Sequence, residues 1–593
     1  MPENNVRIKI DGKDIEVPQG STILAACRSA GIVIPTLCYL EGISEEASCS
    51  ICVVEVKGAK TLLRSCVTAV NNGMEILTNS QRVRRARKTN LELLLASHPE
   101  DCFFCDRNQH CELRRLAHDM GVRDAPFVKA LKSGITVDKT SPSLIRDADK
   151  CILCRRCIAV CSKVQSVNAI DTIHRGKLSY VSTFMEMGLG NVECINCGQC
   201  LLVCPTGAII EQSAIENVWR DLSDPKKIVL VETAPAVRAS IGEEFGMPAG
   251  SLATGKMAAA LRRMGFNKVF DTQFSADLTI MEEGFELIER IKHKGVLPMI
   301  TSCSPGWIKF AEHFYPEALK HVSSCKSPQQ MFGAIAKTYY AQKMGVDPRN
   351  IVVVSIMPCT AKKFEAKRAE MKSAFLYWKD KMKLKDEEAF FDVDYVLTTR
   401  EAARMIQEAG ICFNELKDEN FDEPLGVSTG AAVIFGATGG VMEAALRTAY
   451  EVLTGKTLEK LDFENLRGLD GIKTAEVDID GLKIKVAVAS SLSKARVLLD
   501  EIKSGKSPYA FIEIMTCPGG CIGGGGQPLP TNTEVRQKRM QAIYEEDKNK
   551  PIRKSHENPA VKKLYEEFLE KPLGEKSEEL LHTHYCARPV YSR

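Results

Sequence analysis

All but four of the 23 cysteines in this chain fall into five groups whose spacings match the ligand patterns of iron–sulfur clusters. The four outside the groups are Cys27, Cys325, Cys412 and Cys586. Four groups lie in the N-terminal part, whereas the fifth is assembled from three distant segments that each follow an apolar run. The distribution predicts a redox protein whose N-terminal clusters conduct electrons to a buried metal site.

Composition narrows the class of protein further. At 593 residues the chain is long enough for three or four domains, each with an ample core. Its net charge of +3, with 26% charged residues, does not indicate nucleic acid or a membrane as a partner. The N-terminus lacks a signal-peptide segment, and no stretch approaches the roughly 18–20 apolar residues of a spanning helix. The cysteines therefore indicate metal ligation in the reducing cytoplasm, not the disulfides of a secreted protein.

Residues 1–80 are predicted to form a small β-rich domain. A hairpin over residues 6–17, with its turn at Asp11-Gly12, precedes a short helix over residues 22–30. Four loop cysteines then suit a [2Fe–2S] cluster, with structural zinc as the alternative. They are spaced C-x10-C-x2-C-x13-C: Cys38, Cys49, Cys52 and Cys66. The spacing resembles the ferredoxin domain of NADH-dehydrogenase-type subunits, and Cys27 is predicted to be a small buried hydrophobe.

Residues 81–140 begin with a basic helical stretch and then carry one histidine and three cysteines at metal-ligand spacing. The pattern is His98-x3-Cys102-x2-Cys105-x5-Cys111. One imidazole among three thiolates lowers the negative charge of a cluster and shifts its potential. The pattern resembles the [4Fe–4S] module found beside the same ferredoxin domain. His110 is a rival to His98 as the ligand, and zinc is again the alternative.

Residues 141–213 contain an internal repeat of the spacing C-x2-C-x2-C-x3-C, and Pro205 follows the second copy. This is the run of bacterial two-cluster ferredoxins, in which the fourth cysteine of each copy ligates the other cluster. One [4Fe–4S] cluster is therefore expected to take Cys151, Cys154, Cys157 and Cys204. The other is expected to take Cys194, Cys197, Cys200 and Cys161.

Residues 214–593 alternate between short apolar runs and amphipathic stretches, which predicts a large α/β domain. The runs read as strands buried on both faces of a parallel or mixed sheet: 227–231, 296–300, 351–356 and 510–515. The amphipathic stretches read as covering helices: 254–264, 329–344 and 401–408. In such folds the site lies beyond the carboxyl ends of the strands. Cys303, Cys359 and Cys517 each follow a predicted strand, so they are expected to converge.

Three segments around these cysteines resemble the signatures of one family, the [FeFe]-hydrogenases. They are TSCSPGW (301–307), MPCTAKK (357–363) and EIMTCPGGCIGGGGQP (513–528), and FGATGGVMEAALR (435–447) is a further shared stretch. The resemblance covers essentially the whole chain. It implies a cubane [4Fe–4S] cluster, joined through a cysteine thiolate to a two-iron unit with CO, cyanide and azadithiolate. By motif position Cys521 is the bridging ligand, and Cys359 and Cys517 bind the cubane.

The resemblance also implies roles for other residues of the pocket. Lys362 is expected to donate to a cyanide ligand, and Met357 and Met515 to offer soft contacts beside the irons. Ordinary core packing is the alternative for both methionines. Glycines 519–520 and 523–526 are expected to let the backbone approach the cluster closely. A phosphate cradle is disfavoured, because no Lys-Ser/Thr pair follows the glycine run.

A proton relay follows from the same resemblance. Glu283, Glu286 and Ser323 match its positions, and Cys303 is the thiol next to the azadithiolate amine. Buried carboxyl groups with raised pKa pass protons near neutral pH. The alternative for both glutamates is a solvated helix face, since Glu282, Glu283 and Glu286 cluster in the sequence.

One departure from the family pattern concerns the fourth cubane ligand. Many relatives have two adjacent cysteines, the first a proton shuttle and the second a ligand, where this chain has Cys303-Ser304. Strict alignment makes Cys303 the shuttle and puts Ser304 in the ligand place. Either the serine oxygen binds iron, or Cys303 or another thiol such as Cys325 takes that place. For Cys325 a packing role behind the site is preferred.

The tail, residues 548–593, is charged and helical in pattern and is predicted to pack as a C-terminal extension. Its trio His582-x-His584-x-Cys586 is interpreted as a surface segment and not as a metal site. Cys412 has no companions in the sequence.

Together these inferences predict a multidomain α/β (α+β) enzyme, an iron-only hydrogenase catalysing 2H⁺ + 2e⁻ ⇌ H2. Its cofactors are one [2Fe–2S], three accessory [4Fe–4S] clusters and the two-part active-site cluster. The Cys-Ser signature and the N-terminal modules resemble the catalytic subunit of NAD(P)-linked, often electron-bifurcating hydrogenases.

The resemblance also sets the expected partners. No Gly-x-Gly-x-x-Gly opens a helix in this chain, so the expected partners are a flavin-bearing subunit, a small [2Fe–2S] subunit and ferredoxin. The alternatives are a monomeric ferredoxin-linked hydrogenase and a non-catalytic sensory or electron-transfer subunit.

Overall fold

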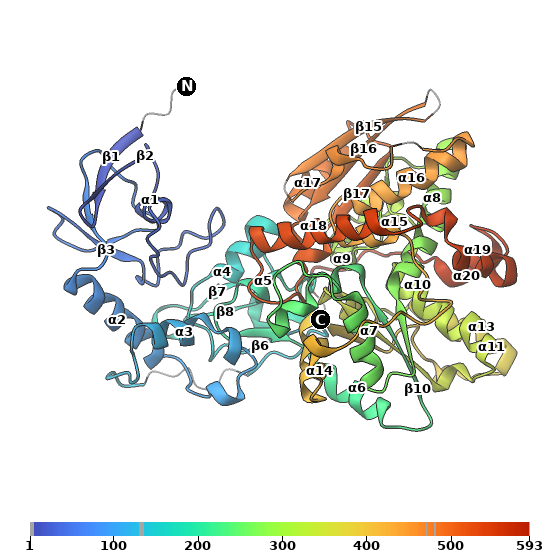
Figure 1. The fold of residues 1–593 in the computed structure, drawn as a ribbon, viewed down its shortest axis with the longest axis horizontal. Coiled ribbons are helices and arrows are strands. Elements are labelled where there is room, and N and C mark those ends of the chain that lie inside the picture. Colours follow the sequence, from blue (N-terminus) through green and yellow to red (C-terminus); the bar gives the residue numbers. More distant parts are fainter. Residues whose placement is uncertain (1–4, 130–135, 459, 470, 480–481, 592–593) are drawn as a thin grey trace. The chain divides into compact units, whose positions relative to one another are not determined.

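The computed structural model describes residues 5–129, 136–458, 460–469, 471–479 and 482–591. The chain divides into two compact units. The first comprises Met1–Thr140, Ile145–Val192 and Val203–Ile210, and the second Ser141–Leu144, Glu193–Leu202 and Glu211–Arg593. Part of the ferredoxin-like repeat thus belongs to the same unit as the large α/β region (Figure 1).

The first unit opens with the predicted hairpin, which is confirmed. Strands β1 (Asn5–Ile10) and β2 (Lys13–Pro18) pair antiparallel and join β3 (Val53–Val56), β4 (Leu63–Arg64) and β5 (Glu75–Leu77) in the order β2-β1-β5-β3-β4. Val6, Ile8 and Ile10 alternate towards the core, as the period of a strand requires. Helix α1 (Ile23–Ser29) is capped by Thr22 and buries Cys27 as expected. The predicted basic helix is α2 (Gln81–Ala96).

The second unit contains a parallel four-stranded sheet in the order β11-β10-β13-β14. Its strands are β10 (Ile228–Thr233), β11 (Lys268–Asp271), β13 (Ile351–Met357) and β14 (Tyr395–Thr398). Every residue of β13 is buried, which confirms a strand covered on both faces. The flanking helices include α7 (Thr254–Arg263) and α14 (Thr399–Glu408), close to the predicted ranges.

A second sheet of the same unit has the order β12-β17-β16-β15. Its strands are β12 (Met299–Ile300), β15 (Ile472–Ile479), β16 (Leu482–Ser490) and β17 (Phe511–Met515), and only β15 runs antiparallel to its neighbour. The predicted strand 296–300 was wrong in length. Pro298 has no N–H to give to a ladder, and Val296 and Leu297 are 41% and 37% exposed, so pairing starts at Met299.

Long helices cover these sheets, among them α8 (Thr272–Lys292) and α16 (Gly440–Thr454). The predicted helix 329–344 is present as α10 (Pro328–Ile335), a π-helical turn and α11 (Ala341–Met344). No helix among the described ranges is long and apolar enough to cross a membrane.

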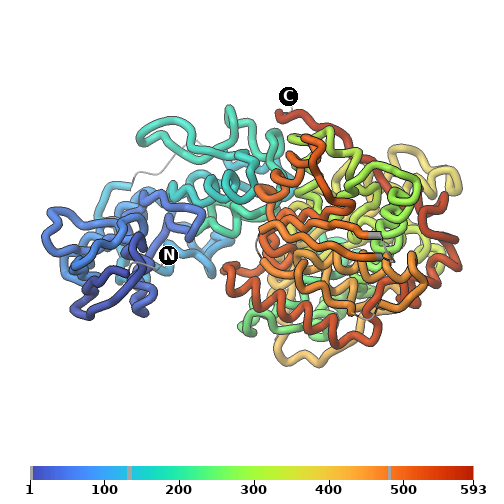
Figure 2. Tube along the Cα trace, turned by 90° about the horizontal axis from the view of Figure 1, so that it is seen from above, coloured from blue at the N-terminus to red at the C-terminus, as the bar shows by residue number. Residues whose placement is uncertain are grey.

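The tail packs against the second unit, as predicted. It contains α18 (Thr533–Asn549), α19 (Pro559–Leu564) and α20 (Glu575–Leu581). Helix α19 contacts α8, and α20 contacts α10 and α13 (Ser373–Met382), so the red end of the chain returns onto earlier helices (Figure 2). Leu564, Leu580 and Leu581 are part of the core beside the parallel sheet.

Candidate active site

A cavity of about 90 Å³ lies in the second unit, where strands of both sheets end. Its wall includes Met357 and Met515, the last residues of β13 and β17. The three cysteines expected to follow strands, Cys303, Cys359 and Cys517, all line this cavity. Cys521, from the same signature segment as Cys517, lines it too. Residues separated by more than two hundred positions therefore share one cavity because parallel strands end at one edge.

The thiols of this cavity would hold a metal cluster in an enclosed apolar site. Burial raises the pKa of Cys359 and Cys517, and it raises that of Cys521 to about 12. The positive charge of Lys362 opposes these shifts at Cys359 and Cys521. Thiols in such a place release their protons only when a cation compensates them, as metal ligands do. The donor set thus fits an iron–sulfur group.

Glycines make room for a group on the cavity wall. Gly520 has φ +90°, and a Cβ there would lie 2.6 Å from the backbone nitrogen of Thr438. A Cβ at Gly524 would collide with the carbonyl oxygen of Pro358. Both glycines line the cavity, so the backbone of the third signature can approach a bound group where a larger residue could not.

Lys362 is held at the cavity by residues that the sequence did not single out. Its Nζ donates to Glu365 Oε2 at 2.8 Å and to the carbonyl oxygen of Cys303 at 3.2 Å. Gln329 also lines the cavity, and its Oε1 is buried without a hydrogen-bond partner in the described structure. The spacing of Lys362 and Glu365 on α12 (Ala361–Glu365) is the one sequence signal for this pair, since positions i and i+3 are neighbours on a helix.

Cys303 and Ser304 both line the cavity, so both remain candidates for the fourth ligand of the cubane cluster. The hydroxyl of Ser304 lies 2.8 Å from that of Thr516, and it accepts from the Thr516 backbone N–H at 3.4 Å. Burial, followed by the negative charges of Glu283 and Glu513, raises the pKa of the Cys303 thiol. Burial and the neighbouring acids therefore disfavour the thiolate form of Cys303 unless a cation compensates it.

The expected relay residues form a chain on α8 and the loop before α10. Glu283 is fully buried, accepts weakly from the Ser302 N–H (3.4 Å) and has its pKa raised to about 8 by burial and then by the charge of Glu286. Ser323 Oγ donates to Glu286 Oε2 at 2.6 Å, and Arg290 binds Glu286 Oε1 at the same distance. The alternative of a solvated helix face is wrong for Glu283, which is fully buried, whereas the side chain of Glu286 is 12% exposed.

His582 is also buried, so its interpretation as part of a surface segment was wrong. Its Nε2 lies 3.2 Å from Glu282 Oε2, and its Nδ1 lies 2.8 Å from Ser324 Oγ and 4.0 Å from Cys325 Sγ. His584 and Cys586, the other members of the trio, are exposed. Cys325 lies beside Glu286 and His582 and is not on the cavity wall.

Cys197, from the ferredoxin-like repeat, lines the same cavity. The segment around it packs closely on the signatures: Thr360 Oγ1 donates to the Asn196 carbonyl at 2.7 Å, and Gln199 Nε2 donates to that of Gly523 at 2.9 Å. A Cβ at Gly525 would collide with the carbonyl oxygen of Cys197. A cluster on Cys194, Cys197 and Cys200 would therefore adjoin the active-site cavity.

The predicted ligands in the first unit also gather. Cys52 Sγ lies 3.3 Å from Cys66 Sγ, and a hydrogen bond to Cys49 lowers the pKa of Cys38 to about 5. These four cysteines are the predicted [2Fe–2S] ligands.

The other predicted ligand sets of the first unit lie further along the chain. Burial and the charges of Cys105 and Cys102 raise the pKa of Cys111. His98 is buried whereas His110 is exposed, which favours His98 as the ligand. One pocket is lined by the predicted set Cys151, Cys154, Cys157 and Cys204. The place of Cys161 as the fourth ligand of the other cluster stays a prediction.

Comparisons with known families agree with this arrangement. Residues 227–525 match the C-terminal domain of the iron-only hydrogenase large subunit, and residues 533–588 match the iron hydrogenase small subunit. The N-terminal matches are a 2Fe-2S cluster binding domain (3–81), the iron–sulfur binding region of NADH-ubiquinone oxidoreductase-G (87–126) and a 4Fe-4S dicluster domain (150–208).

Individual relatives extend the likeness over the whole chain. The protein is 52% identical to the NADP-reducing hydrogenase subunit HndD of Solidesulfovibrio fructosivorans, over 98% of this chain and 99% of that one. It is 42% identical to iron hydrogenase 1 of Clostridium pasteurianum over the same shares. An apo variant of [FeFe]-hydrogenase HydA1 from Chlamydomonas reinhardtii superposes with a TM-score of 0.56 at 42% identity, over 64% of this chain and 100% of that one.

The fold and the cavity define an oxidoreductase with iron–sulfur domains before a large α/β catalytic domain. The chain belongs to the iron-only, or [FeFe], hydrogenase family.

Proposed function

We propose that this chain catalyses the reversible reaction 2H⁺ + 2e⁻ ⇌ H2 in the cavity where Cys303, Cys359, Cys517 and Cys521 meet. The observation that carries the proposal is this convergence beside the buried acid Glu283. When bound, the active-site cluster would supply the redox chemistry, with Cys521 as bridging ligand and Cys359 and Cys517 on the cubane. The fourth cubane position falls to Ser304 or Cys303.

The chain's own residues would then handle the proton. The buried carboxyl of Glu283, whose pKa is about 8, can hold a proton at neutral pH and release it to a neighbour. Ser323 and Glu286 continue the path outwards to Arg290, which is 17% exposed. Met357, Met515 and Phe435 keep water out of the cavity, and Lys362 places a positive charge at its wall.

Electrons would enter through the four accessory clusters. The last of them would be the cluster on Cys194, Cys197 and Cys200, because Cys197 lines the catalytic cavity. The spacing of 19 of the 23 cysteines in iron–sulfur ligand patterns fits ligation in a reducing compartment such as the cytoplasm.

We infer that the natural electron partner is a flavin-bearing, NAD(P)-linked subunit within an electron-bifurcating complex that also contains a small [2Fe–2S] subunit and uses ferredoxin. The name of the relative HndD, an NADP-reducing hydrogenase subunit, supports this inference. Phe103 and Phe104, 94% and 89% exposed, lie between Cys102 and Cys105 and offer an apolar contact next to an accessory cluster. The alternative is a monomeric, ferredoxin-linked hydrogenase.

Two measurements test these proposals. The matured protein is expected to contain about 20 irons per chain and to show infrared bands of CO and cyanide, whereas about 14 irons would leave only the accessory clusters. The purified chain alone is expected to exchange electrons with viologen dyes or ferredoxin and not with NADH. Stable NADH-dependent H2 formation without added subunits would contradict the partner assignment.

A further inference from the structure

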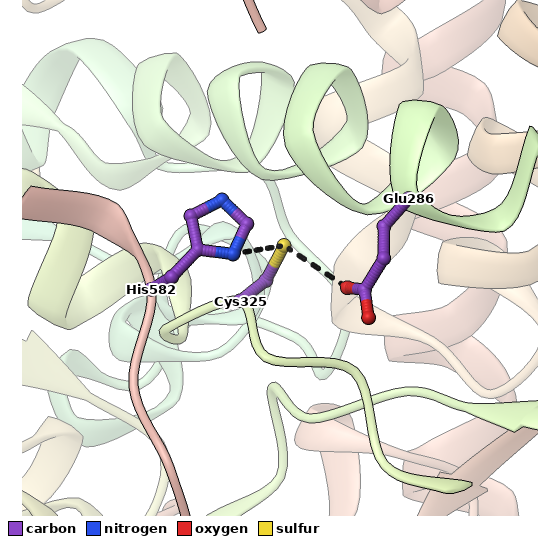
Figure 3. A group of neighbouring side chains, drawn as sticks. All are labelled: Glu286, Cys325 and His582. Atoms are coloured by element: carbon purple, nitrogen blue, oxygen red, sulfur yellow. Dashed lines mark hydrogen bonds between the residues drawn. The ribbon is translucent and has the colours of Figure 1, made fainter. Parts of the chain in front are cut away.

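Outside the catalytic cavity, three metal-binding side chains from three elements converge. Glu286 extends from α8, Cys325 lies in the loop before α10, and His582 follows α20 (Figure 3). Cys325 Sγ lies between the other two, 3.9 Å from Glu286 Oε2 and 4.0 Å from His582 Nδ1, and the three ligand atoms lie within 4.8 Å of one another. We propose that Glu286, Cys325 and His582 bind a zinc-like divalent cation, and that the bound cation blocks proton transfer through Glu286.

The donor set and its dimensions suit zinc. Zinc–ligand bonds of about 2.0–2.3 Å in a tetrahedron place ligand atoms roughly 3.3–3.6 Å apart. The two distances from Cys325 Sγ therefore need to shorten by only about half an ångström. A thiolate and a carboxylate balance the two positive charges, the thiol proton passes to solvent, and a water molecule completes the four ligands.

His582 is already oriented for ligation. Its Nε2 lies 3.2 Å from Glu282 Oε2, so a proton on Nε2 is bound by a carboxylate. Metal-bound histidines use their second nitrogen in this way. The Nδ1 of His582 faces Cys325 Sγ at 4.0 Å and the Ser324 hydroxyl at 2.8 Å, and the cation would replace that hydroxyl as the partner of Nδ1. Glu282 is held in turn by the Leu573 N–H at 2.9 Å and the Ser577 hydroxyl at 2.9 Å, which fixes the pair to the tail.

Two other groups of possible metal ligands in the described structure differ from the Glu286, Cys325 and His582 group, because lysine or arginine side chains already neutralise their acids. Glu443, Asp462 and Asp547 are compensated by bound arginines, as in the pairs of Arg447 with Glu443 and Asp547. In the group of Glu451, His556 and Glu557, Lys554 binds both glutamates. A cation there would have to displace a resident positive charge.

In the proposed site the arginine does not bind the metal-facing oxygen of Glu286, which accepts hydrogen bonds from the Ser323 hydroxyl at 2.6 Å and the Ser324 N–H at 3.2 Å. Arg290 binds Glu286 through Oε1, whereas Oε2 faces Cys325. The side chains of Glu286 and Arg290 are 12% and 17% exposed, which gives a cation a route from solvent.

The blocking effect rests on the proposed function, in which Glu286 passes protons to and from Ser323. Glu286 Oε2, the oxygen nearest Cys325, also accepts the Ser323 hydrogen bond at 2.6 Å. A cation on this oxygen competes with that hydrogen bond and removes the carboxylate from the relay. Turnover is therefore expected to fall while every iron–sulfur cluster stays intact.

The test is zinc K-edge X-ray absorption on the matured protein with one equivalent of ZnCl2, together with zinc inhibition of H2 turnover. The expected spectrum has one sulfur at about 2.3 Å and nitrogen or oxygen ligands at about 2.0 Å. Cys325→Ser should lose the sulfur shell, and His582→Gln should weaken binding. Each protein's turnover is divided by its own rate without zinc. On that scale, both variants should need at least tenfold more zinc than the wild type for half-inhibition. Cys586→Ser, an exposed cysteine of the same tail, is the matched control and should respond as the wild type does.

Three results would overturn the proposal. An unchanged one-sulfur shell in Cys325→Ser would place the metal elsewhere, and a shell of three or four sulfurs would mean zinc in a vacated cluster site. If one zinc binds per chain with a single sulfur ligand but H2 turnover does not fall, the cation does not block proton transfer. That result would leave the proposed H2 chemistry unaffected. Absence of H2 turnover in the zinc-free protein would instead count against the proposed function, because the absorption measurement reports the metal site by itself.

Discussion

The cluster sites of the first unit and the catalytic cavity of the second unit are built in opposite ways. In the first unit the expected ligands of each cluster mostly come from short loops within one stretch of chain, as with Cys102, Cys105 and Cys111. In the second unit the cysteines at the ends of β12, β13 and β17 come from segments far apart in the sequence. The second site therefore exists only once both sheets have formed.

Their surroundings differ as well. Phe103 and Phe104 beside the ligands of the first unit are almost fully exposed, whereas the catalytic unit buries Glu232, Glu283 and Glu513 with pKa values of about 8, 8 and 7. An electron relay needs ligands and a partner that can reach it, whereas H2 chemistry also needs protons delivered into a dry cavity. Substitutions in the two units should therefore affect H2/D2 exchange very differently.

Cys521→Ser should abolish H2/D2 exchange, by a factor on the order of 10³ or more, because the bound cofactor supplies the chemistry. Electron paramagnetic resonance should still show the accessory clusters. Cys412→Ser, which changes an exposed cysteine outside the five ligand groups, is the control. Exchange at the wild-type rate in Cys521→Ser would remove this cavity as the site of catalysis.

Cys303→Ala should lower turnover by roughly 10²–10⁴, as the loss of a proton-transfer group or of a ligand would. Spectroscopy of the cubane separates the two roles: an intact cubane identifies a proton shuttle, and a lost one identifies a ligand. Wild-type activity would refute both.

Glu283→Gln should slow catalysis by about 10² or more with all clusters retained, since an amide cannot accept and release the relayed proton. Glu289→Gln, on the same helix but exposed, is the matched control. Equal rates for the two variants would contradict a relay through Glu283.

H2 evolution should decline as the pH rises through about 8. The pKa of Glu283 is raised by burial, so the group is protonated at neutral pH and loses its proton only above that value. Glu283→Gln should lack this inflection in its remaining activity. Rates from about pH 4 to 9 with a viologen donor provide the test, and a wild-type decline centred near pH 4–5 would indicate an ordinary exposed carboxyl.

Cys49→Ser should leave H2/D2 exchange within about twofold of the wild type, because exchange needs no electrons from outside. The same variant should lose most electron transfer from the physiological partner complex, since its [2Fe–2S] site lacks a ligand. Loss of exchange in this variant would mean that the first unit takes part in more than conduction.

Much of this arrangement can be predicted from the sequence, because the patterns that indicate it each span only a few residues. The hairpin at Asp11-Gly12, the apolar strands and the cysteines that follow them are each visible in a few residues. The short strand at Met299 was misjudged because the apolar run continues across Pro298, which cannot pair. The neighbours Glu282 and His582 were missed because 300 positions separate them and only the packing of the tail on α8 joins them.

H2/D2 exchange by the matured full-length chain, with no electron donor present, distinguishes catalysis in this cavity from electron transfer alone. We expect exchange at a rate comparable to turnover, accompanied by infrared bands of CO and cyanide. A protein with its full complement of iron and those bands, but without exchange, would contradict the claim that this cavity performs H2 chemistry.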